Sequence, residues 1–450
     1  MPKRRRDDEA AEADAAGEDR ISALPDALLQ HLLSLLPAHE AVRTCVLAPR
    51  WRGLWNSAPA LRVTDAGSWS SAESFSDFVN HLLLFGDGSP LAELELEPYP
   101  CGDELHARSC EPCRFVEMWM RHAVVKRHVR VLRVRNRYLC PQAFGLKLRD
   151  YPLVSSRLRC LELEQFDLYY YFMDFSGCPA LEELIIKCSD IAIGGTLSFP
   201  SLKRLAIIKC DVPSEFRIPI SAPRLVSLHL EDLNGMTPLL ESMPSLVTAF
   251  IRLGGIRCAD RCPLDKFGDC GDDQCAPCYG IRDDDDDDDD GDGPVLLTSL
   301  SNASHLELIA ERGVGIFKRD LKWFPTFSKL KTLLLNEWSL ASGLRAISCF
   351  LQHSAMLEKV TLQLNEEPED TIELEGSCIP TDKLLHPKHL KLVEIRYLKV
   401  DERVLNVLKI LNTFGISLDR INILKTSSLS NCFSFERCKE DLAVAGSTST

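Results

Sequence analysis

The chain has 450 residues, too many for one compact core, so several structural units or one elongated array are expected. With 45% hydrophobic and 26% charged residues, its composition is globular and excludes a chain that is disordered throughout. It lacks an apolar stretch long enough for a transmembrane helix, and residues 1–18 lack the apolar segment of a secretory signal. We therefore expect an intracellular protein of the nucleus, the cytoplasm or both, with a disordered tail over 1–18.

The net charge of −14 is concentrated in one segment. Residues 283–292 carry nine aspartates, and without them the net charge is about −5. The uninterrupted run 283–290 lacks the spacing of a calcium-binding EF-hand loop, so a solvated linker is the preferred interpretation. The basic cluster Lys3–Arg6 fits either a nuclear-import signal or a solvated tail. The sequence has no basic stripe with interleaved aromatic residues, so we do not expect nucleic acid as a partner. Because it also lacks a transmembrane segment, we expect no membrane partner.

Three short helices are predicted between residues 19 and 63. The first follows Pro25 and ends at Pro37, because proline is tolerated at the start of a helix and not in its interior. A second helix is expected from about His39 to Leu47, and a third from Pro49 through Trp55. Their leucines form an apolar face too wide for three short helices to bury among themselves, which implies a protein partner.

Three motifs stand out in this segment: DRISALPD at 19–26, LLSLLP at 32–37 and VRTCVLAPRWRGLW at 42–55. With these motifs the segment resembles an F-box, the adaptor-docking module of SCF-type ubiquitin ligases; an unrelated three-helix bundle is the alternative. Ala48-Pro49 departs from the plant pattern, which usually has serine and a basic residue there. The resemblance implies docking of a Skp-type adaptor, and through it a cullin scaffold. The candidate adaptor-binding residues are Leu24, Pro25, Leu28, Leu29, Leu32, Val42, Val46, Leu47, Trp51, Leu54 and Trp55.

Beyond residue 90 the pattern L-x-x-L-x-L recurs, and from Leu158 to Leu246 its first positions lie 21 or 23 residues apart. This period is typical of leucine-rich repeats, in which alternate residues of short parallel strands point into a shared core. Among the repeats from Leu158 to Leu246, Cys210 alone occupies the Asn/Cys position after the strand, so irregular loops are expected. An enzyme built on a doubly wound βα sheet is the alternative, but this spacing leaves little room for crossover helices.

The expected fold is therefore α/β: a three-helix F-box followed by an irregular leucine-rich-repeat solenoid of parallel strands with helices and loops. Segments 330–338, 350–360 and 401–411 resemble the FBD region that closes many plant F-box/leucine-rich-repeat proteins. The last of them is expected to be an amphipathic helix that caps the final strand. The predicted organisation is a tail (1–18), the F-box (19–63), leucine-rich repeats (64–257), a Cys-rich and poly-Asp insert (258–294), further repeats (295–425, FBD-like from about 330) and a loose tail (426–450).

Most of the 18 cysteines are expected to be free thiols, because the chain is large and expected to be intracellular. Cys110-x-x-Cys113 lies in no thioredoxin-like unit and is interpreted as a pair of structural loop cysteines. The insert has spacings close to those of a four-thiolate zinc site, although a flexible insert that merely contains cysteines is preferred, and no cofactor is otherwise expected. The candidate zinc ligands are Cys258, Cys262, Cys275 and Cys278.

The sequence lacks a nucleophile elbow, an H-E-x-x-H motif, a phosphate loop and a dinucleotide fingerprint. The resemblance implies a non-catalytic substrate receptor of an SCF ubiquitin ligase, which holds a target protein close to a ubiquitin-charged enzyme. A leucine-rich-repeat scaffold without ubiquitin transfer is the alternative. The target is expected on the outward residues of the strands, whose mixed character suits a protein. The candidate contacts are Arg159, Glu162, Glu182, Ile185, Arg204, Ala206, Ser227 and His229.

Overall fold

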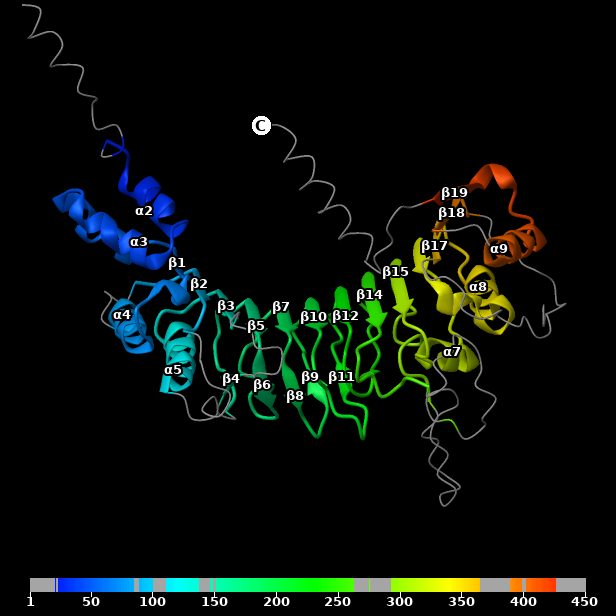
Figure 1. Cartoon of the computed structure of the whole chain (residues 1–450), viewed down its shortest axis with the longest axis horizontal. Helices are drawn as coiled ribbons and strands as arrows, with labels where there is room; N and C mark the ends of the chain where they lie inside the picture. The colour runs from blue at the N-terminus through cyan, green and yellow to red at the C-terminus, as the bar shows by residue number, and fades with distance from the viewer. Residues whose placement is uncertain are drawn as a thin grey trace, which may run out of the picture. The chain divides into compact units, whose positions relative to one another are not determined.

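The structure is a computed structural model, and it describes residues 21, 23–84, 89–99, 111–136, 146–148, 151–262, 275, 293–364, 389–398 and 402–425. These residues form two compact units, which we call the N-terminal unit (described residues up to 136) and the C-terminal unit (described residues from 146) (Figure 1). In the described part of the chain, every helix is too short or too polar to cross a membrane. The segments predicted as tails or linker, 1–18, 283–290 and 426–450, lie outside the described residues.

The N-terminal unit begins with short helices around a small core. Helices α2 (Asp26–Ser34) and α3 (Ala38–Arg43) form where the prolines predict them, each directly after a proline. The third predicted helical segment forms two 3-10 helices in place of one continuous helix, because Gly53, a poor helix former, interrupts it. These are η3 (Pro49–Arg52) and η4 (Leu54–Ser57), and a further 3-10 helix, η2 (Thr44–Val46), precedes them. The core consists of Leu29, Leu33, Ala41, Trp51 and Leu54.

Three parallel strands complete the N-terminal unit: β1 (Ala60–Val63), β2 (Glu93–Leu96) and β3 (Val131–Arg135). Leu61, Leu94 and Leu132 are register partners and are buried, as the repeat pattern requires. The connections contain η5 (Ala66–Ser68), α4 (Ala72–Leu84) and α5 (Glu111–Val125). Figure 1 shows α4 and α5 side by side below the strands. Strand β1 lies inside the segment that resembles an F-box, so that segment already contributes to the sheet.

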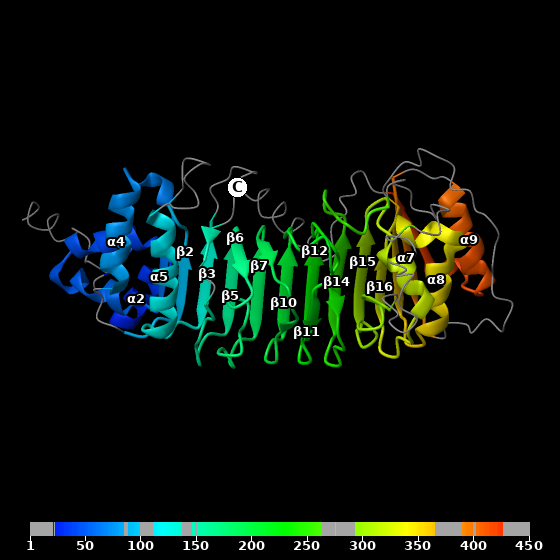
Figure 2. The same ribbon diagram turned by 90° about the horizontal axis from the view of Figure 1, so that it is seen from below.

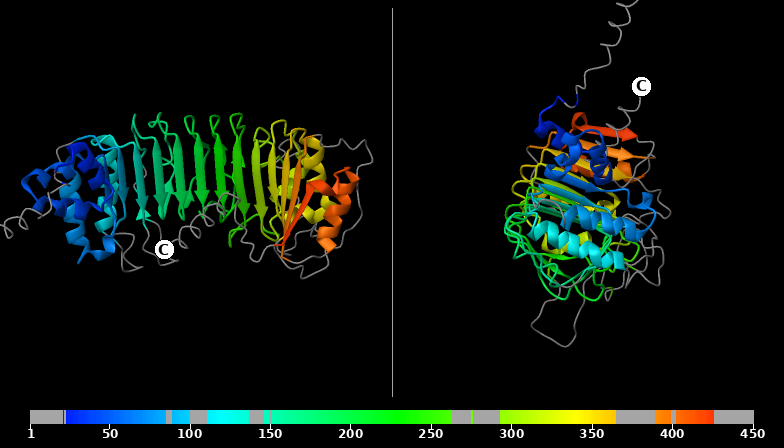
Figure 3. Two further views of the ribbon diagram at one scale, coloured as in Figure 1. Left: turned by 90° about the horizontal axis from the view of Figure 1, so that it is seen from above. Right: turned by 90° about the vertical axis from the view of Figure 1, so that its left-hand side faces the viewer.

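The C-terminal unit is a long parallel sheet whose strands point the same way (Figures 2 and 3). Leu161, Leu184, Leu205, Leu228 and Ala249, the second positions of successive repeats, are register partners and buried. The predicted solenoid of parallel strands is therefore confirmed. In spatial order the strands are β5 (Cys160–Glu164), β7 (Glu183–Lys187), β10 (Arg204–Ile208), β12 (Ser227–Glu231), β14 (Thr248–Leu253), β15 (His305–Ala310), β16 (Thr332–Leu335), β17 (Lys359–Leu364), β18 (Leu392–Tyr397) and β19 (Ile421–Lys425).

Each early repeat turns sharply after its main strand. Gln165, Cys188, Lys209 and Asp232 follow β5, β7, β10 and β12 and have left-handed backbones, with φ between 48° and 64°. The chain then enters short strands that form two small parallel sheets. These are β4 (Leu146–Lys147), β6 (Phe166–Tyr169) and β8 (Asp190–Ala192), and β9 (Leu197–Ser198), β11 (Pro219–Ser221) and β13 (Leu239–Leu240).

Regular repeats carry asparagine at a fixed position after the strand, and here two other residues occupy that position and donate the hydrogen bond. The thiol of Cys210 donates to the carbonyl of Ile186 on the preceding strand, with sulfur and oxygen 3.6 Å apart. Trp338 stands at the same position after β16, and its indole N–H donates to the carbonyl of Leu308 at 2.9 Å. Both satisfy a buried carbonyl of the neighbouring repeat, so the irregular repeats keep this bond without asparagine.

Helices cover the later strands: α7 (Ile316–Asp320), η6 (Leu321–Trp323), η7 (Glu337–Leu340), α8 (Ala341–His353), α9 (Glu402–Thr413) and η8 (Leu418–Arg420). Helix α9 is amphipathic as predicted, with Val404, Val407 and Leu411 buried. It does not cap the last strand, because the chain continues into β19, which pairs with β18. Helix α9 instead connects β18 to β19.

Candidate functional site

The F-box-like segment exposes two groups of apolar side chains. Leu28, Leu32 and Leu35 lie three or four residues apart along α2 and its end, so they share one helix face, and all three are exposed. Val46 and Leu47, at the end of the second helix, are 87% and 65% exposed. Monomeric proteins rarely leave this much apolar surface in contact with water, and such patches mark protein interaction sites.

The structure divides the predicted adaptor-binding residues into three groups. Pro25, Leu28, Leu32, Val46 and Leu47 are exposed and available to a partner. Leu24, Val42 and Trp55 are half-buried. The assignment of Leu29, Trp51 and Leu54 as contacts is corrected, because these side chains are buried in the core of the segment. Leu35 and Leu36 were not among the candidates although they are exposed, and their position in the leucine run was the signal available.

An ion pair holds the start of α2 against the third predicted helical segment. The guanidinium of Arg50 in η3 donates to one carboxylate oxygen of Asp26 through Nε at 2.9 Å and through Nη2 at 2.5 Å. Arg50 Nη2 also donates to the carbonyl of Leu24 at 2.7 Å. Leu24 itself packs against the small core. Leu24 therefore serves the fold of the segment as well as its surface.

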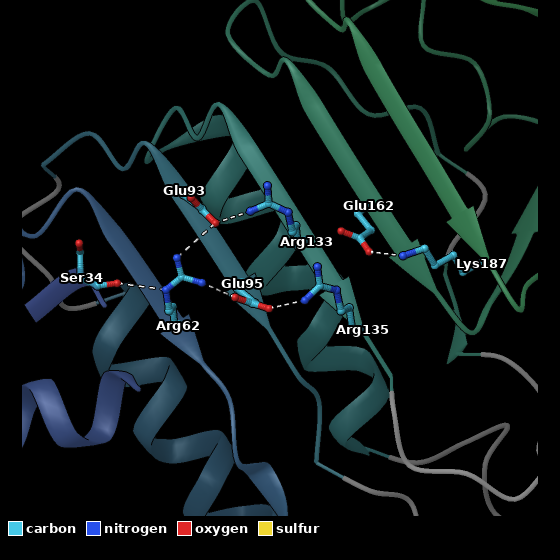
Figure 4. A network of polar contacts seen from close by, with 8 residues as sticks. All are labelled: Ser34, Arg62, Glu93, Glu95, Arg133, Arg135, Glu162 and Lys187. Atoms are coloured by element: carbon cyan, nitrogen blue, oxygen red, sulfur yellow. Dashed lines mark hydrogen bonds and ion pairs between the residues drawn. The ribbon is translucent and has the colours of Figure 1, made fainter. Parts of the chain in front are cut away.

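A ladder of alternating charges crosses the three strands of the N-terminal unit (Figure 4). Arg62 on β1 donates to Glu95 on β2 at 2.6 Å, and Arg135 on β3 donates to the same carboxylate. Arg133 on β3 donates to Glu93 on β2. These side chains occupy the sheet face opposite the buried leucines, because neighbouring residues of a strand point to opposite faces. Each charge therefore has a partner of opposite sign on the adjacent strand.

The predicted target-binding residues do not all lie on the strand face. Arg159 and Glu182 precede β5 and β7, and Glu182 accepts a hydrogen bond from Lys203 at 2.8 Å. Placing Glu162 on an accessible surface is wrong: it is 3% exposed. Lys187 on the neighbouring strand extends across and donates to its carboxylate at 2.9 Å (Figure 4). Alternation along a strand sets the face on which a side chain lies but not how far its neighbours cover it.

The other candidates form the central part of the outer sheet face. Ile185, Ala206, His229 and Phe250 are register partners along the middle row of β7, β10, β12 and β14, and all are half-buried. Of these, Phe250 was not predicted. Beside this row, Arg204 is exposed and Ser227 half-buried in strands β10 and β12.

Charged pairs border this row, which is apolar except for His229. Arg204 donates to both carboxylate oxygens of Glu183 at 3.0 Å. Arg252 donates to Glu231 at 2.5 Å, and the His229 ring lies 3.0 Å from the same carboxylate. Burial raises the pKa of Glu231, but the hydrogen bond from His229 and the charge of Arg252 outweigh burial and lower it overall. An apolar centre within a polar rim is the usual anatomy of a protein interface.

The Cys-rich region joins the fold at three of its four candidate ligands. Cys258, Cys262 and Cys275 are buried, and the sulfurs of Cys262 and Cys275 lie 3.8 Å apart. Among the described residues, His, Cys, Asp and Glu side chains form no group of three that could hold a metal ion. Cys278 and Cys110 lie outside the described residues. The described part of the site therefore supplies two adjacent thiols.

Burial disfavours the thiolate at three cysteines, Cys178, Cys210 and Cys258. Burial raises the pKa of Cys178 to about 11, that of Cys210 to about 12 and that of Cys258 to about 11. A cysteine nucleophile reacts as the thiolate and needs a lowered pKa. These three thiols are protonated at neutral pH and behave as small apolar side chains.

Comparison with known proteins supports the resemblance seen in the sequence, although no family model matches the chain. An F-box/LRR-repeat protein of Arabidopsis thaliana is 35% identical over 263 residues, which cover 52% of this chain and 82% of that protein. An F-box/FBD/LRR-repeat protein of the same species is 30% identical, covering 53% of this chain and 58% of that protein. The MEIOTIC F-BOX protein MOF of Oryza sativa subsp. japonica is 28% identical, covering 76% and 71%. The chain therefore belongs to the plant F-box/leucine-rich-repeat proteins.

Proposed function

We propose that this protein is the substrate-recognition subunit of an SCF-type ubiquitin ligase. Its F-box docks a Skp-type adaptor, and through it a cullin scaffold, while the repeat sheet binds a target protein. The observation that carries the proposal is the exposure of two groups of apolar side chains on a segment with a compact core: Leu28, Leu32 and Leu35, and Val46 and Leu47. A segment that buries its core and still exposes these side chains has a surface suited to a partner.

The receptor contributes binding and no chemistry of its own. It raises the local concentration of a target lysine near a ubiquitin-charged enzyme, and this proximity lowers the entropic part of the barrier. Burial makes Cys178, Cys210 and Cys258 poor nucleophiles, so the proposal gives these three thiols no chemical role. The nuclear or cytoplasmic location expected from the sequence stays a prediction.

The target surface that fits best is the outer face of β7, β10, β12 and β14. Its middle row presents Ile185, Ala206 and Phe250, and its charged neighbours are already paired within the sheet. A partner with an apolar anchor gains by burying this row, whereas a highly charged partner finds few free charges to neutralise. Substituting Phe250 with alanine should therefore weaken target capture and leave adaptor binding unchanged.

The proposal is tested by adaptor binding followed by ubiquitin transfer. Changing Val46 and Leu47 to aspartate places two charges where the adaptor surface is apolar, and both positions are exposed in the free chain. We expect loss of adaptor pull-down with an unchanged thermal transition. As the matched control, Val226→Asp and Val247→Asp alter exposed valines of the repeat region. Undiminished adaptor binding by the F-box variant would contradict the docking surface; adaptor binding without ubiquitin transfer would indicate a repeat scaffold.

A further inference from the structure

The side chain of Arg62 links the F-box helices to the first repeat strands. It lies in β1, at the end of the F-box segment and at the start of the sheet. We propose that Arg62 is a positioning residue that locks the F-box onto the sheet of the N-terminal unit, so that the adaptor surface and the first three strands move as one rigid body. The consequence for ubiquitin transfer rests on the proposed function.

On one side, Arg62 bonds to the end of the first F-box helix. Its Nε donates to the backbone carbonyl of Ser34 at 3.1 Å, and Ser34 is the last residue of α2 and is buried. The last carbonyls of a helix lack hydrogen-bond donors within the helix and carry partial negative charge. A guanidinium placed there supplies the donor and a compensating positive charge. The backbone of Pro37, before α3, also forms a parallel bridge with Arg62. Both F-box helices are thereby connected to β1.

On the other side, the same guanidinium bonds to the sheet (Figure 4). Its Nη1 donates to Glu95 at 2.6 Å, and its Nη2 lies 3.7 Å from Glu93. Both glutamates are in turn held by Arg133 and Arg135 of β3. The side chains of all five residues are less than one third exposed, so solvent screens their interactions less than those of surface pairs. Arg62 therefore joins the helix end to a ladder that spans three strands.

A second, aromatic contact prevents rotation about this joint. His39, in α3, packs edge-on against Trp69, with ring centroids 6.2 Å apart. Trp69 contacts Phe75 and Phe78 of α4, at 5.9 and 4.8 Å. The F-box is thus held at the end of α2 by the hydrogen bond from Arg62 and at α3 by an edge-to-face ring contact. Two separate attachments fix an orientation that one attachment would leave free to swivel.

Rigid attachment matters for a receptor that works by proximity. When the F-box swivels, the rest of the chain samples many orientations relative to the bound adaptor, and the effective concentration of a target lysine falls. Loss of the Arg62 contacts should consequently slow ubiquitin transfer without weakening adaptor binding, because the exposed apolar residues are unchanged.

The test compares Arg62→Met with Arg62→Lys and with the control Arg133→Met in the full chain. Methionine keeps the aliphatic stem and removes every N–H, whereas lysine restores a donor and the charge. Arg133 is the control because it belongs to the same ladder but lies on β3, where it donates to Glu93. Hydrogen exchange is followed for residues 35–40 at the joint and residues 28–33 inside α2. Adaptor affinity and ubiquitin transfer to the receptor's own lysines are measured with purified Skp-type adaptor and cullin.

In Arg62→Met we expect exchange over 35–40 to rise about tenfold, the size expected when one hydrogen bond to a charged group is lost. Exchange over 28–33 and adaptor affinity should change less than twofold, transfer should slow several-fold, and Arg62→Lys should recover part of both losses. Unchanged exchange at the joint, or an equal rise in Arg133→Met, overturns the proposal. Faster exchange over 28–33 together with lost adaptor binding overturns it too, because Arg62 would then merely stabilise the F-box. If the unmodified chain fails to bind adaptor, the proposed function fails, while the exchange result still decides the role of Arg62.

Discussion

Leu32 and Leu33 are adjacent in α2 but differ in exposure, 46% against 2%. The same substitution at each position therefore separates partner binding from folding. Leu32→Ala should weaken adaptor binding and leave the stability of the free chain nearly unchanged. Leu33→Ala should destabilise the F-box, because Leu33 belongs to its core.

The expected free-energy changes follow from the apolar area that Leu32 buries on adaptor binding and that Leu33 buries on folding. Complete burial of a leucine side chain is worth about 1.5–3 kcal/mol, so covering the exposed half of Leu32 on binding contributes about 1 kcal/mol. Losing that contribution corresponds to a roughly fivefold increase in Kd. Leu33→Ala removes buried atoms and leaves a cavity, which costs about 2–5 kcal/mol of unfolding free energy.

The assay combines denaturant unfolding with adaptor titration. Trp51 is buried in the same core and is one of six tryptophans, so unfolding of the F-box contributes to the change in tryptophan fluorescence. Adaptor affinity is measured by calorimetry under conditions in which both variants are folded. The reasoning is refuted if Leu32→Ala binds adaptor as tightly as the unmodified chain. It is also refuted if both variants lower the unfolding midpoint equally, because α2 would then not present the face described here.

Three further outcomes are expected. Asp260 is almost fully buried and paired with Arg217 at 2.5 Å, so Asp260→Ala should lower the unfolding free energy by about 3 kcal/mol in denaturant melts; a change below 1 kcal/mol would contradict this. Trp338→Phe removes the indole donor from a buried carbonyl and should cost about 1–3 kcal/mol in the same assay, whereas an unchanged midpoint would deny the bond any role. Burial and the charge of Asp211 raise the pKa of Asp190, so the folded state binds the proton of this carboxyl more tightly than the unfolded state does. The stability contributed by the protonated carboxyl is therefore lost as pH rises. Asp190→Asn should raise the melting temperature at pH 7 and raise it less at pH 4; a gain that does not depend on pH would disprove the explanation.

The repeat architecture was predictable because it depends on local regularities. Alternation within a short strand determines which residues point inward, and near-constant spacing brings the same position of each repeat into register. The buried partners Leu161, Leu184 and Leu205 follow directly from this pattern. Strand β19 was missed because its sequence shows no clean alternation of apolar and polar residues: Ile423 and Leu424 are adjacent. Both side chains are partly exposed in the structure.

The candidate surfaces were only partly predictable, because exposure depends on neighbours that are remote in sequence. Leu28 and Leu29 look equivalent in a leucine run, yet the first is exposed and the second is fully buried by residues of η3 and η4. Glu162 lies on the outer face as alternation requires but is covered, with Lys187 bonded to its carboxylate. In both cases the spacing of residues in the sequence identifies a face of the helix or strand. Whether that face is accessible depends on side chains of other elements that pack against it.

The end of the F-box resemblance does not coincide with a boundary in the packing of the N-terminal unit. The resemblance ends at Val63, but β1 contributes Leu61 and Val63 to a core shared with β2. Cutting the chain at that point would expose both side chains and remove the glutamates that hold Arg62. An F-box joined to its repeats by a free linker would make side-chain contacts only within the F-box. Here the last strand of the motif is the first strand of the sheet, so folding of the proposed adaptor-binding surface and of the first repeats is coupled.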